Sequence, residues 1–280
     1  MKDFHTAHNR FLKSLIQQSR QETLQYVKNG MEQQLGSASP DEQTLWRYLQ
    51  NPQRHTSLTS SQQLVAMDLL REHNLPFGVS TCYTSANYAD ISSEQFFDMM
   101  IDMGAMFVWF FHYMPVGNEA VPALLPTPEQ RKIVYERIRA FRNTKPIFSM
   151  DFQNDAEYVG GCIAGGRNYL HINAAGDVEP CVFIHYSNVN IHDCSLLDAL
   201  KTPLFMAYHD GQPFNKNMLR PCPMLENPQI LRDMVKRTGA KSTDLQSPES
   251  VDHLCDKCEP YARNWQPTAD DLWSASRKGV

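Results

Sequence analysis

The sequence predicts an α/β protein, in which a parallel β/α layer precedes a small, loop-rich part that contains a β-hairpin. From residue 61 to about residue 155, short apolar runs alternate with amphipathic segments, as in β/α units joined by right-handed crossovers. After about residue 155 this alternation stops, and short elements are separated by proline-rich and polar loops. Six of the seven cysteines lie beyond this point. We therefore expect a helical N-terminal extension at 1–60, an α/β domain at 61–155 and a cysteine-containing domain at 156–280.

Each element of the α/β domain has its own signal. Helices are predicted where apolar residues recur every three or four positions, and two of them begin at capping residues, one at Ser92 or Ser93 and one at Thr127. Strands are predicted at short apolar runs, as in a parallel sheet that is covered on its faces. The expected order is helix 61–74, strand 75–84, helix 92–105, strand 106–114, helix 127–141 and strand 146–152.

The C-terminal domain has a different pattern. Residues 168–184 are typical of two strands joined by a turn at 175–177, which predicts a hairpin. Short helices are expected at 195–209 and 227–239. No long periodic element is expected in this domain.

Composition excludes several classes of protein. The chain has 280 residues, 42% of them hydrophobic, and a formal net charge of −5. No apolar run approaches the ~18 residues that a membrane helix needs, and the N-terminus lacks the apolar segment of a secretory signal. A mildly acidic balance argues against a nucleic-acid partner that is held by charge. We therefore expect a cytoplasmic protein with no membrane or nucleic-acid partner.

The cysteines carry the chemical signal. Disulfides are rare in the cytosol, so clustered thiols favour metal binding or catalysis. Cys162 and Cys181 flank the predicted hairpin, Cys222 lies in a proline-flanked loop, and Cys255 and Cys258 form a CxxC pair. Four thiolates from these segments could ligate one metal centre. Zinc and an iron–sulfur cluster both suit such a site, and spacing alone does not separate them.

Two further features have simpler interpretations. Cys82 and Cys194 are expected to be small core residues, because cysteine is among the most buried residue types. The Gly165-Gly166 pair before Arg167 could let backbone amides approach an anion, although it is not a P-loop.

At these residues the chain resembles a radical SAM protein with a SPASM-type C-terminal domain. The resemblance is carried by the C-x13-G-x4-C pattern from Cys162 through Gly176 to Cys181, by KTPLFMAYHDGQPF and RPCPMLENP, and upstream by LPFGVSTCYTS and FFHYMPVG. It covers about residues 61–275. It implies an incomplete parallel (β/α) barrel-like layer followed by a small SPASM-like iron–sulfur domain.

The resemblance also implies a cofactor and its ligands. One auxiliary [4Fe–4S] cluster would be held by Cys162, Cys181, Cys222 and Cys258, with Cys255 as the substitute for Cys258. The cysteines are too few for two full auxiliary clusters. Zinc is the alternative metal.

The SAM-binding part of the family pattern is incomplete. The CxxxCxxC motif that holds the SAM-binding cluster is absent from the chain. The resemblance implies that S-adenosylmethionine would contact the strand ends at Ser80, Thr81, Met114, Pro115 and Gly117. Packing and turn formation explain these five residues equally well. Without the motif, no electron donor in this chain would contact the sulfonium of SAM.

Three functions follow from this pattern. The first is a radical SAM/SPASM oxidoreductase or maturase, in which a partner polypeptide or a longer reading frame supplies the missing N-terminal half. The second is a non-catalytic cluster-binding scaffold, and the third is a zinc-stabilised interaction module. A peptide and a small molecule are equally compatible with the sequence as substrate, and whether this chain does chemistry alone is left open.

Overall fold

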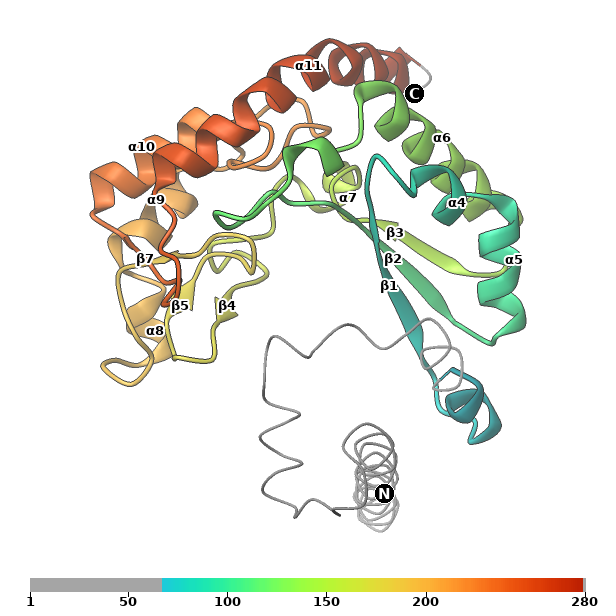
Figure 1. Cartoon of the computed structure of the whole chain (residues 1–280), viewed down its shortest axis with the longest axis horizontal. Coiled ribbons are helices and arrows are strands. Elements are labelled where there is room, and N and C mark those ends of the chain that lie inside the picture. The colour runs from blue at the N-terminus through green and yellow to red at the C-terminus, as the bar shows by residue number, and fades with distance from the viewer. Residues whose placement is uncertain (1–66, 279–280) are drawn as a thin grey trace, which may run out of the picture. The chain divides into compact units, whose positions relative to one another are not determined.

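The structure, a computed structural model, describes residues 67–278 of the chain. Three parallel strands, β1 (Gly78–Tyr83), β2 (Phe107–His112) and β3 (Phe148–Asp151), form a sheet in the order β1-β2-β3 (Figure 1). Ser80 of β1 is in register with Trp109 of β2, which is in register with Met150 of β3. The predicted parallel α/β layer is confirmed. The predicted extension at 1–60 and the start of the predicted helix 61–74 lie outside the described residues, and residues 67–72 are helical.

Helices cover one face of this sheet. They are α4 (Tyr88–Ile91), α5 (Glu94–Asp102) and α6 (Pro128–Thr144). The α5 helix begins at Ser93, whose side chain accepts a hydrogen bond from the backbone N–H of Phe96, and α6 begins with a capping box between Thr127 and Gln130. Alternate strand residues such as Val108 and Phe110 are fully buried against these helices.

The other face of the sheet carries aromatic side chains. Because side chains alternate along a strand, Trp109 and Phe111 point away from the helices. Their rings lie 4.8 Å apart between centroids, and the Phe152 ring lies 4.9 Å from that of Phe111. Phe183 of the C-terminal part approaches Phe111 edge-on at 6.3 Å. This face forms one wall of the cavity described below.

The C-terminal part consists of short elements and one long helix. The hairpin β4 (His171–Ile172) and β5 (Val178–Glu179) is antiparallel, as predicted, although each strand has only two residues. A second antiparallel pair joins β6 (Tyr186–Ser187) to β7 (Lys241–Ser242). The remaining elements are η1 (Pro122–Leu124), α7 (Ala156–Val159), α8 (Leu196–Ala199), α9 (Pro203–Gly211), α10 (Pro228–Thr238) and α11 (Val251–Lys278).

Two expectations for this part are wrong. The predicted helix 195–209 is two helices, since Pro203 cannot continue α8 and instead takes the first position of α9. The C-terminal residues form the 28-residue helix α11, where no long element was expected. This helix keeps Pro260 and Pro267 in its interior, and it packs against α10 and α6.

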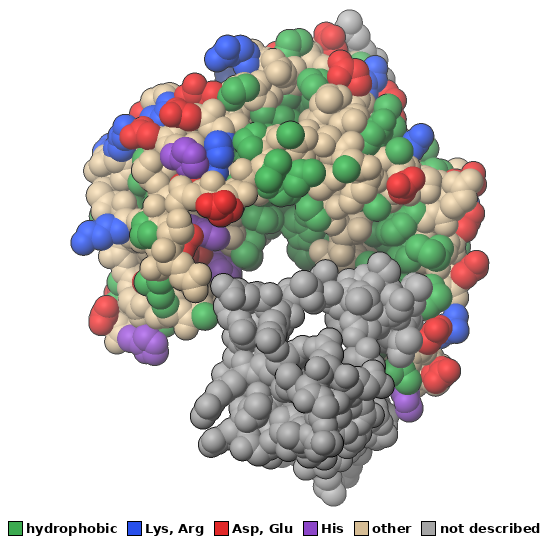
Figure 2. Space-filling view, in the orientation of Figure 1, with side chains coloured by type: hydrophobic (Ala, Val, Ile, Leu, Met, Phe, Trp, Pro, Cys, Tyr) green, Lys and Arg blue, Asp and Glu red, His purple; other side chains and the backbone are tan. Residues whose placement is uncertain are grey.

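The surface of the described residues is mixed in character. Hydrophobic side chains gather in the middle of the face shown in Figure 2, whereas charged side chains are frequent over α10 and α11. Within residues 67–278, no helix has both the length and the apolar character needed to cross a membrane.

Candidate functional site

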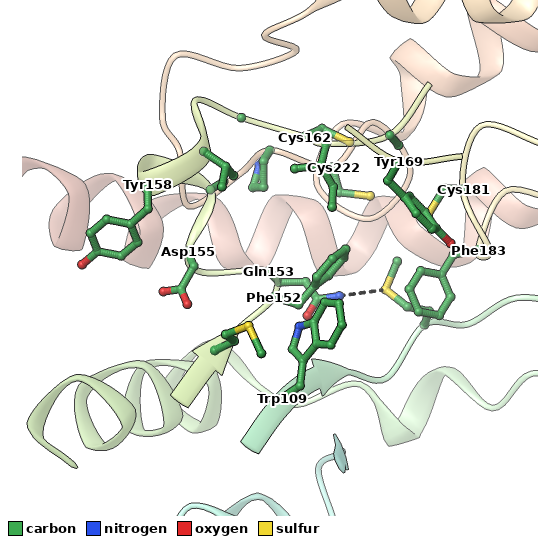
Figure 3. Close-up of a pocket in the computed structure, with 18 of the residues that line it drawn as sticks. Trp109, Phe152, Gln153, Asp155, Tyr158, Cys162, Tyr169, Cys181, Phe183 and Cys222 are labelled. Carbon is green, nitrogen blue, oxygen red and sulfur yellow. Dashed lines mark hydrogen bonds between the residues drawn. The ribbon is translucent and has the colours of Figure 1, made fainter. Parts of the chain in front are cut away.

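A cavity of about 540 Å³ lies between the aromatic face of the sheet and the C-terminal part. The side chains of Trp109, Met150 and Phe152 line it from the sheet, and three thiols, those of Cys162, Cys181 and Cys222, line it from the C-terminal part (Figure 3). The charged side chains in its wall are Arg142 and Asp155, which pair with each other. An uncharged ligand, or a metal held by the cysteine sulfurs, therefore fits this cavity better than a free ion does.

Two glycines place Cys162 in the cavity wall. Helix α7 ends at Gly160, which has a φ of 72°, and Gly161 follows with a φ of 115°. A residue with a side chain rarely adopts these left-handed conformations, so the pair turns the chain sharply at the end of the helix. The backbone amide of Ala164 then favours the thiolate form of Cys162.

A tight turn after β5 places Cys181. The backbone N–H of Ile184 donates to the carbonyl oxygen of Cys181 at 2.9 Å and closes the turn. Inside the turn, the backbone amide of Phe183 favours the thiolate form of Cys181. The Tyr169 hydroxyl supports the turn from outside by accepting the backbone N–H of Val182 at 3.0 Å.

Prolines and one buried carboxylate place Cys222. Pro221 and Pro223 flank it and prevent a regular helix. The Oε2 atom of Glu226 accepts the backbone N–H of Cys222 at 2.8 Å, and the backbone N–H of Leu225 donates to the Cys222 sulfur at 3.4 Å. The three thiols thus share one feature, which is that a backbone amide of the same loop favours the thiolate form of each.

The same thiols are neutral in this apolar setting. Burial raises the pKa of Cys162 to about 11 and that of Cys181 to about 12, and it also raises the pKa of Cys222. The backbone amides act in the opposite direction, because they stabilise the thiolate. A metal cation would supply the missing positive charge, so the chemistry of this donor set fits a soft metal ion or an iron–sulfur cluster.

The two cysteines of the CxxC pair lie on α11, outside the cavity wall. Cys255 and Cys258 are both fully buried, and the Cys255 thiol donates to the carbonyl oxygen of Pro228 at 3.2 Å. Within residues 67–278, no group of three or more His, Cys, Asp or Glu side chains is placed closely enough to hold a metal ion. A four-thiolate centre would therefore require the thiols to move toward one another.

A tyrosine completes the thiol end of the cavity. Tyr208 of α9 lines the same cavity and is fully buried. Its hydroxyl has no hydrogen-bond partner among the described residues. Burial, followed by the neighbouring thiols of Cys162, Cys181, Cys222 and Cys255, raises the pKa of Tyr208, so the hydroxyl keeps its proton.

Comparison with known proteins finds neighbours among solved structures. The chain is similar to native anSMEcpe with bound AdoMet and to a polyhistidine-tagged form of anSMEcpe with bound AdoMet, both at 13% identity and a TM-score of 0.39. The alignments cover 77% and 78% of this chain and 62% and 60% of the neighbours, so the chain spans less than two thirds of their length. No protein-family model matches the chain. No curated protein matches it either.

The five residues suggested for SAM lie in different surroundings. Met114 lines the cavity, where the Gln153 side-chain amide donates to its sulfur at 3.8 Å. Ser80 lies on the aromatic face of the sheet in register with Trp109, whereas Thr81 lies on the face that the helices cover.

The other two lie in the loop that follows β2. Pro115 is buried. The backbone N–H of Gly117 donates to Glu249, and its carbonyl oxygen accepts from Lys257. A role of these residues in binding SAM stays a prediction.

Three other sequence expectations can be compared with the structure. Cys82 is exposed on β1, so the expectation that it is a core residue is wrong. Cys194 is partly buried beside a small apolar cluster and fits that expectation. The amides of Gly165 and Gly166 donate to the carbonyl oxygens of Pro180 and Tyr169, so they hold the loop instead of an anion.

A buried polar network lies behind the thiol end of the cavity. The guanidinium of Arg131 pairs with Glu226 at 2.8 Å, and both side chains are 0% exposed. Arg131 also donates to the hydroxyl of Tyr261 at 3.0 Å, and that hydroxyl lies 2.6 Å from the Nε2 atom of His112. Since the Nδ1–H of His112 donates to the carbonyl oxygen of Tyr113 at 2.7 Å, Nε2 accepts the Tyr261 proton. Burial lowers the pKa of His112, which agrees with this neutral form.

Asp151, at the end of β3, belongs to the same buried region. Its Oδ2 atom accepts a hydrogen bond from Asn154 at 2.8 Å, whereas Oδ1 has no partner among the described residues. Burial and the nearby carboxylate of Asp155 raise the pKa of Asp151 from 3.8 to about 6, against the opposing effects of Arg139 and Arg131.

Because of this shift, Asp151 should make the free energy of unfolding depend on pH, and Asp151→Asn should remove this dependence. Because the native pKa lies above the unfolded value, the folded chain binds more protons than the unfolded chain at intermediate pH. The contribution of Asp151 is therefore present below about pH 4 and is lost as the pH rises through about 6, by up to about 3 kcal/mol. Urea unfolding of both chains in steps from about pH 4 to about pH 8 measures it.

Comparing the unchanged chain with Asp151→Asn separates the effect of Asp151 from that of other titrating groups. His112 acts in the opposite direction, since its lowered pKa destabilises the fold as the pH falls below the unfolded value, but it is present in both chains. The difference in unfolding free energy should change up to about pH 6 and stay flat above about pH 7. A difference that is constant at every pH would contradict the prediction.

Sequence reasoning missed two residues of the site. Glu226 is the single acidic residue of the proline-flanked segment that carries Cys222, and this isolated charge is the signal that points to it. Tyr208 has no comparable signal, because its role depends on three loops that are distant in sequence.

Proposed function

We propose that this chain binds a [4Fe–4S] cluster through Cys162, Cys181, Cys222 and one thiol of the Cys255–Cys258 pair. One observation carries the proposal. Three thiols line one cavity, and at least one backbone amide of its own loop favours the thiolate form of each. Hydrogen bonds to the sulfurs are a main means by which proteins tune iron–sulfur clusters.

The residues of this chain would have distinct tasks. Cys162, Cys181 and Cys222 would supply thiolates, and the amides of their loops would offset part of the negative charge. Glu226 would hold the Cys222 loop in place through the backbone N–H of Cys222. The aromatic wall at Trp109 would limit the access of water to this end of the cavity. When bound, the cluster would supply one-electron transfer or a site for substrate coordination.

We further propose that the chain is the cluster-carrying part of a radical SAM/SPASM oxidoreductase or maturase, and that a partner polypeptide supplies the SAM-cleaving cluster. The support is the motif resemblance around Cys162, Gly176 and Cys181, together with the absence of a CxxxCxxC motif from this sequence. A cluster-binding scaffold without catalysis is the second candidate, and the same missing motif favours it.

Anaerobic reconstitution tests the proposal. After incubation with ferrous iron and sulfide, followed by desalting, the chain is expected to retain iron and sulfide in equal amounts and to show broad visible absorption. The loaded chain, given SAM and dithionite, is expected to form no 5′-deoxyadenosine. Retention of zinc alone would overturn the cluster in favour of a zinc-stabilised module, and formation of 5′-deoxyadenosine would overturn the need for a partner.

A further inference from the structure

The phenol ring of Tyr208 is fixed by its neighbours. A methyl group built on Gly165 would lie 2.4 Å from the Cβ atom of Tyr208 and 2.7 Å from its ring, so only a glycine lets the ring pack this closely. Gly165 has a φ of 70°, which a residue with a side chain adopts rarely. On another side, Phe214 meets the Tyr208 ring edge-on, with 5.3 Å between centroids. The hydroxyl therefore has a defined position.

That position leaves the hydroxyl without a partner among residues 67–278, although Tyr208 is fully buried. A buried hydroxyl without a hydrogen bond is costly, and native proteins contain few of them. The side chain lines the same cavity as Cys162, Cys181 and Cys222. The same three thiols act on the pKa of the Tyr208 hydroxyl, so a group that they bind would be the acceptor of its hydrogen bond.

We propose that Tyr208 donates a hydrogen bond to the sulfur atoms of the metal centre, either a bridging sulfide or a ligating thiolate, and so adjusts its reduction potential. This inference rests on the proposed function. Tyr208 would be a positioning and tuning residue, not a ligand. Its hydroxyl would add one donor to the backbone amides that favour the thiolates of the three cysteines.

The expected effect has a definite sign. Adding an electron makes a cluster more negative and its sulfurs better hydrogen-bond acceptors, so a donor stabilises the reduced state more than the oxidised state. Loss of the donor should therefore lower the reduction potential. No proton is transferred in this step, since the phenol keeps its proton in both states.

The test compares Tyr208→Phe with the unchanged chain. In the reconstituted proteins, a redox titration followed by electron paramagnetic resonance is expected to show a more negative potential for Tyr208→Phe at equal iron content. One exchangeable proton coupled to the reduced cluster should also disappear from the electron–nuclear double resonance spectrum. Without metal, Tyr208→Phe should unfold at a higher urea concentration than the unchanged chain, because it removes an unpaired buried hydroxyl.

Tyr83→Phe is the matched control. Tyr83 is equally buried, but it does not line the cavity, and its hydroxyl lies 3.5 Å from Asn154. This variant should leave the potential and the proton couplings unchanged. An unchanged potential and an unchanged spectrum in Tyr208→Phe would overturn the inference and leave the proposed function standing. An unchanged chain that binds no iron would overturn both.

Discussion

A chain in which Cys222 is replaced by alanine is expected to lose most of the iron that the unchanged chain retains after reconstitution. The same loss is expected for Cys181→Ala. Both thiols line the cavity, and both sulfurs receive backbone amides, so each removal leaves a vacant ligand position next to donors that have lost their acceptor. Iron and sulfide analysis of the desalted proteins, with the visible spectrum, measures the loss.

Two other cysteines provide matched controls. Cys82 is exposed on β1, and Cys194 lies beside another apolar cluster, so Cys82→Ala and Cys194→Ala should retain iron fully. Equal losses in the ligand and control variants would indicate general misfolding and would contradict the assignment. Cys255→Ala and Cys258→Ala, measured alongside, identify the fourth ligand as the variant with the larger loss.

Replacing Arg131 with methionine is expected to lower the free energy of unfolding by about 3–5 kcal/mol. The substitution leaves the buried carboxylate of Glu226 without its partner at 2.8 Å. It also removes the donors to Asn154 at 2.9 Å and to the carbonyl oxygen of Leu219 at 3.3 Å, and the cation over the ring of Trp265. Urea unfolding followed by circular dichroism measures the change.

The neighbouring Lys132 provides the control for this prediction. Lys132 pairs with Glu136 at 3.8 Å, but both side chains are about half exposed, so Lys132→Met should change the stability by less than about 0.5 kcal/mol. Adding Glu226→Leu to Arg131→Met removes the unpaired charge and should recover part of the loss. The recovery should be incomplete, because the backbone N–H of Cys222 then loses its acceptor. Similar costs for Arg131→Met and Lys132→Met would disprove the proposed importance of the buried pair.

The parallel layer was predictable because its signals are local. The sequence predicts the start of α5 to within one residue, at Ser92 or Ser93, and that of α6 at Thr127, and the strand Phe107–His112 is an almost continuous apolar run. Each of these features depends on residues within one turn or one strand. The hairpin was predictable for the same reason, since the turn residue Gly176, with a φ of 91°, lies between its strands.

The helix α11 was not predicted, because two prolines in its interior suggest breaks. Proline removes a backbone hydrogen bond and crowds the preceding turn, so the helix must recover this cost by packing. A buried stripe that recurs every three or four residues provides the packing and could have revealed the helix: Leu254, Cys258, Tyr261, Trp265 and Ala269.

The site was only partly predictable. The sequence singles out Cys162, Cys181 and Cys222, and the structure brings them into one cavity. The backbone amides around their sulfurs depend on the conformation of each loop, which residue types alone do not define. The position of the Tyr208 hydroxyl depends on contacts between α9 and the loop of Gly165, far apart in the sequence.

The long C-terminal helix belongs to both halves of the described chain. The hydroxyl of Tyr261 bonds to His112 at the end of β2, and one turn further on the indole N–H of Trp265 donates to Leu219, close to the Cys222 loop, at 2.8 Å. If either half unfolds, the α11 side chains that it covers become exposed. The sheet and the cysteine loops should therefore unfold as one cooperative unit. Opening the chain at the thiols should then cost as much free energy as unfolding the whole fold.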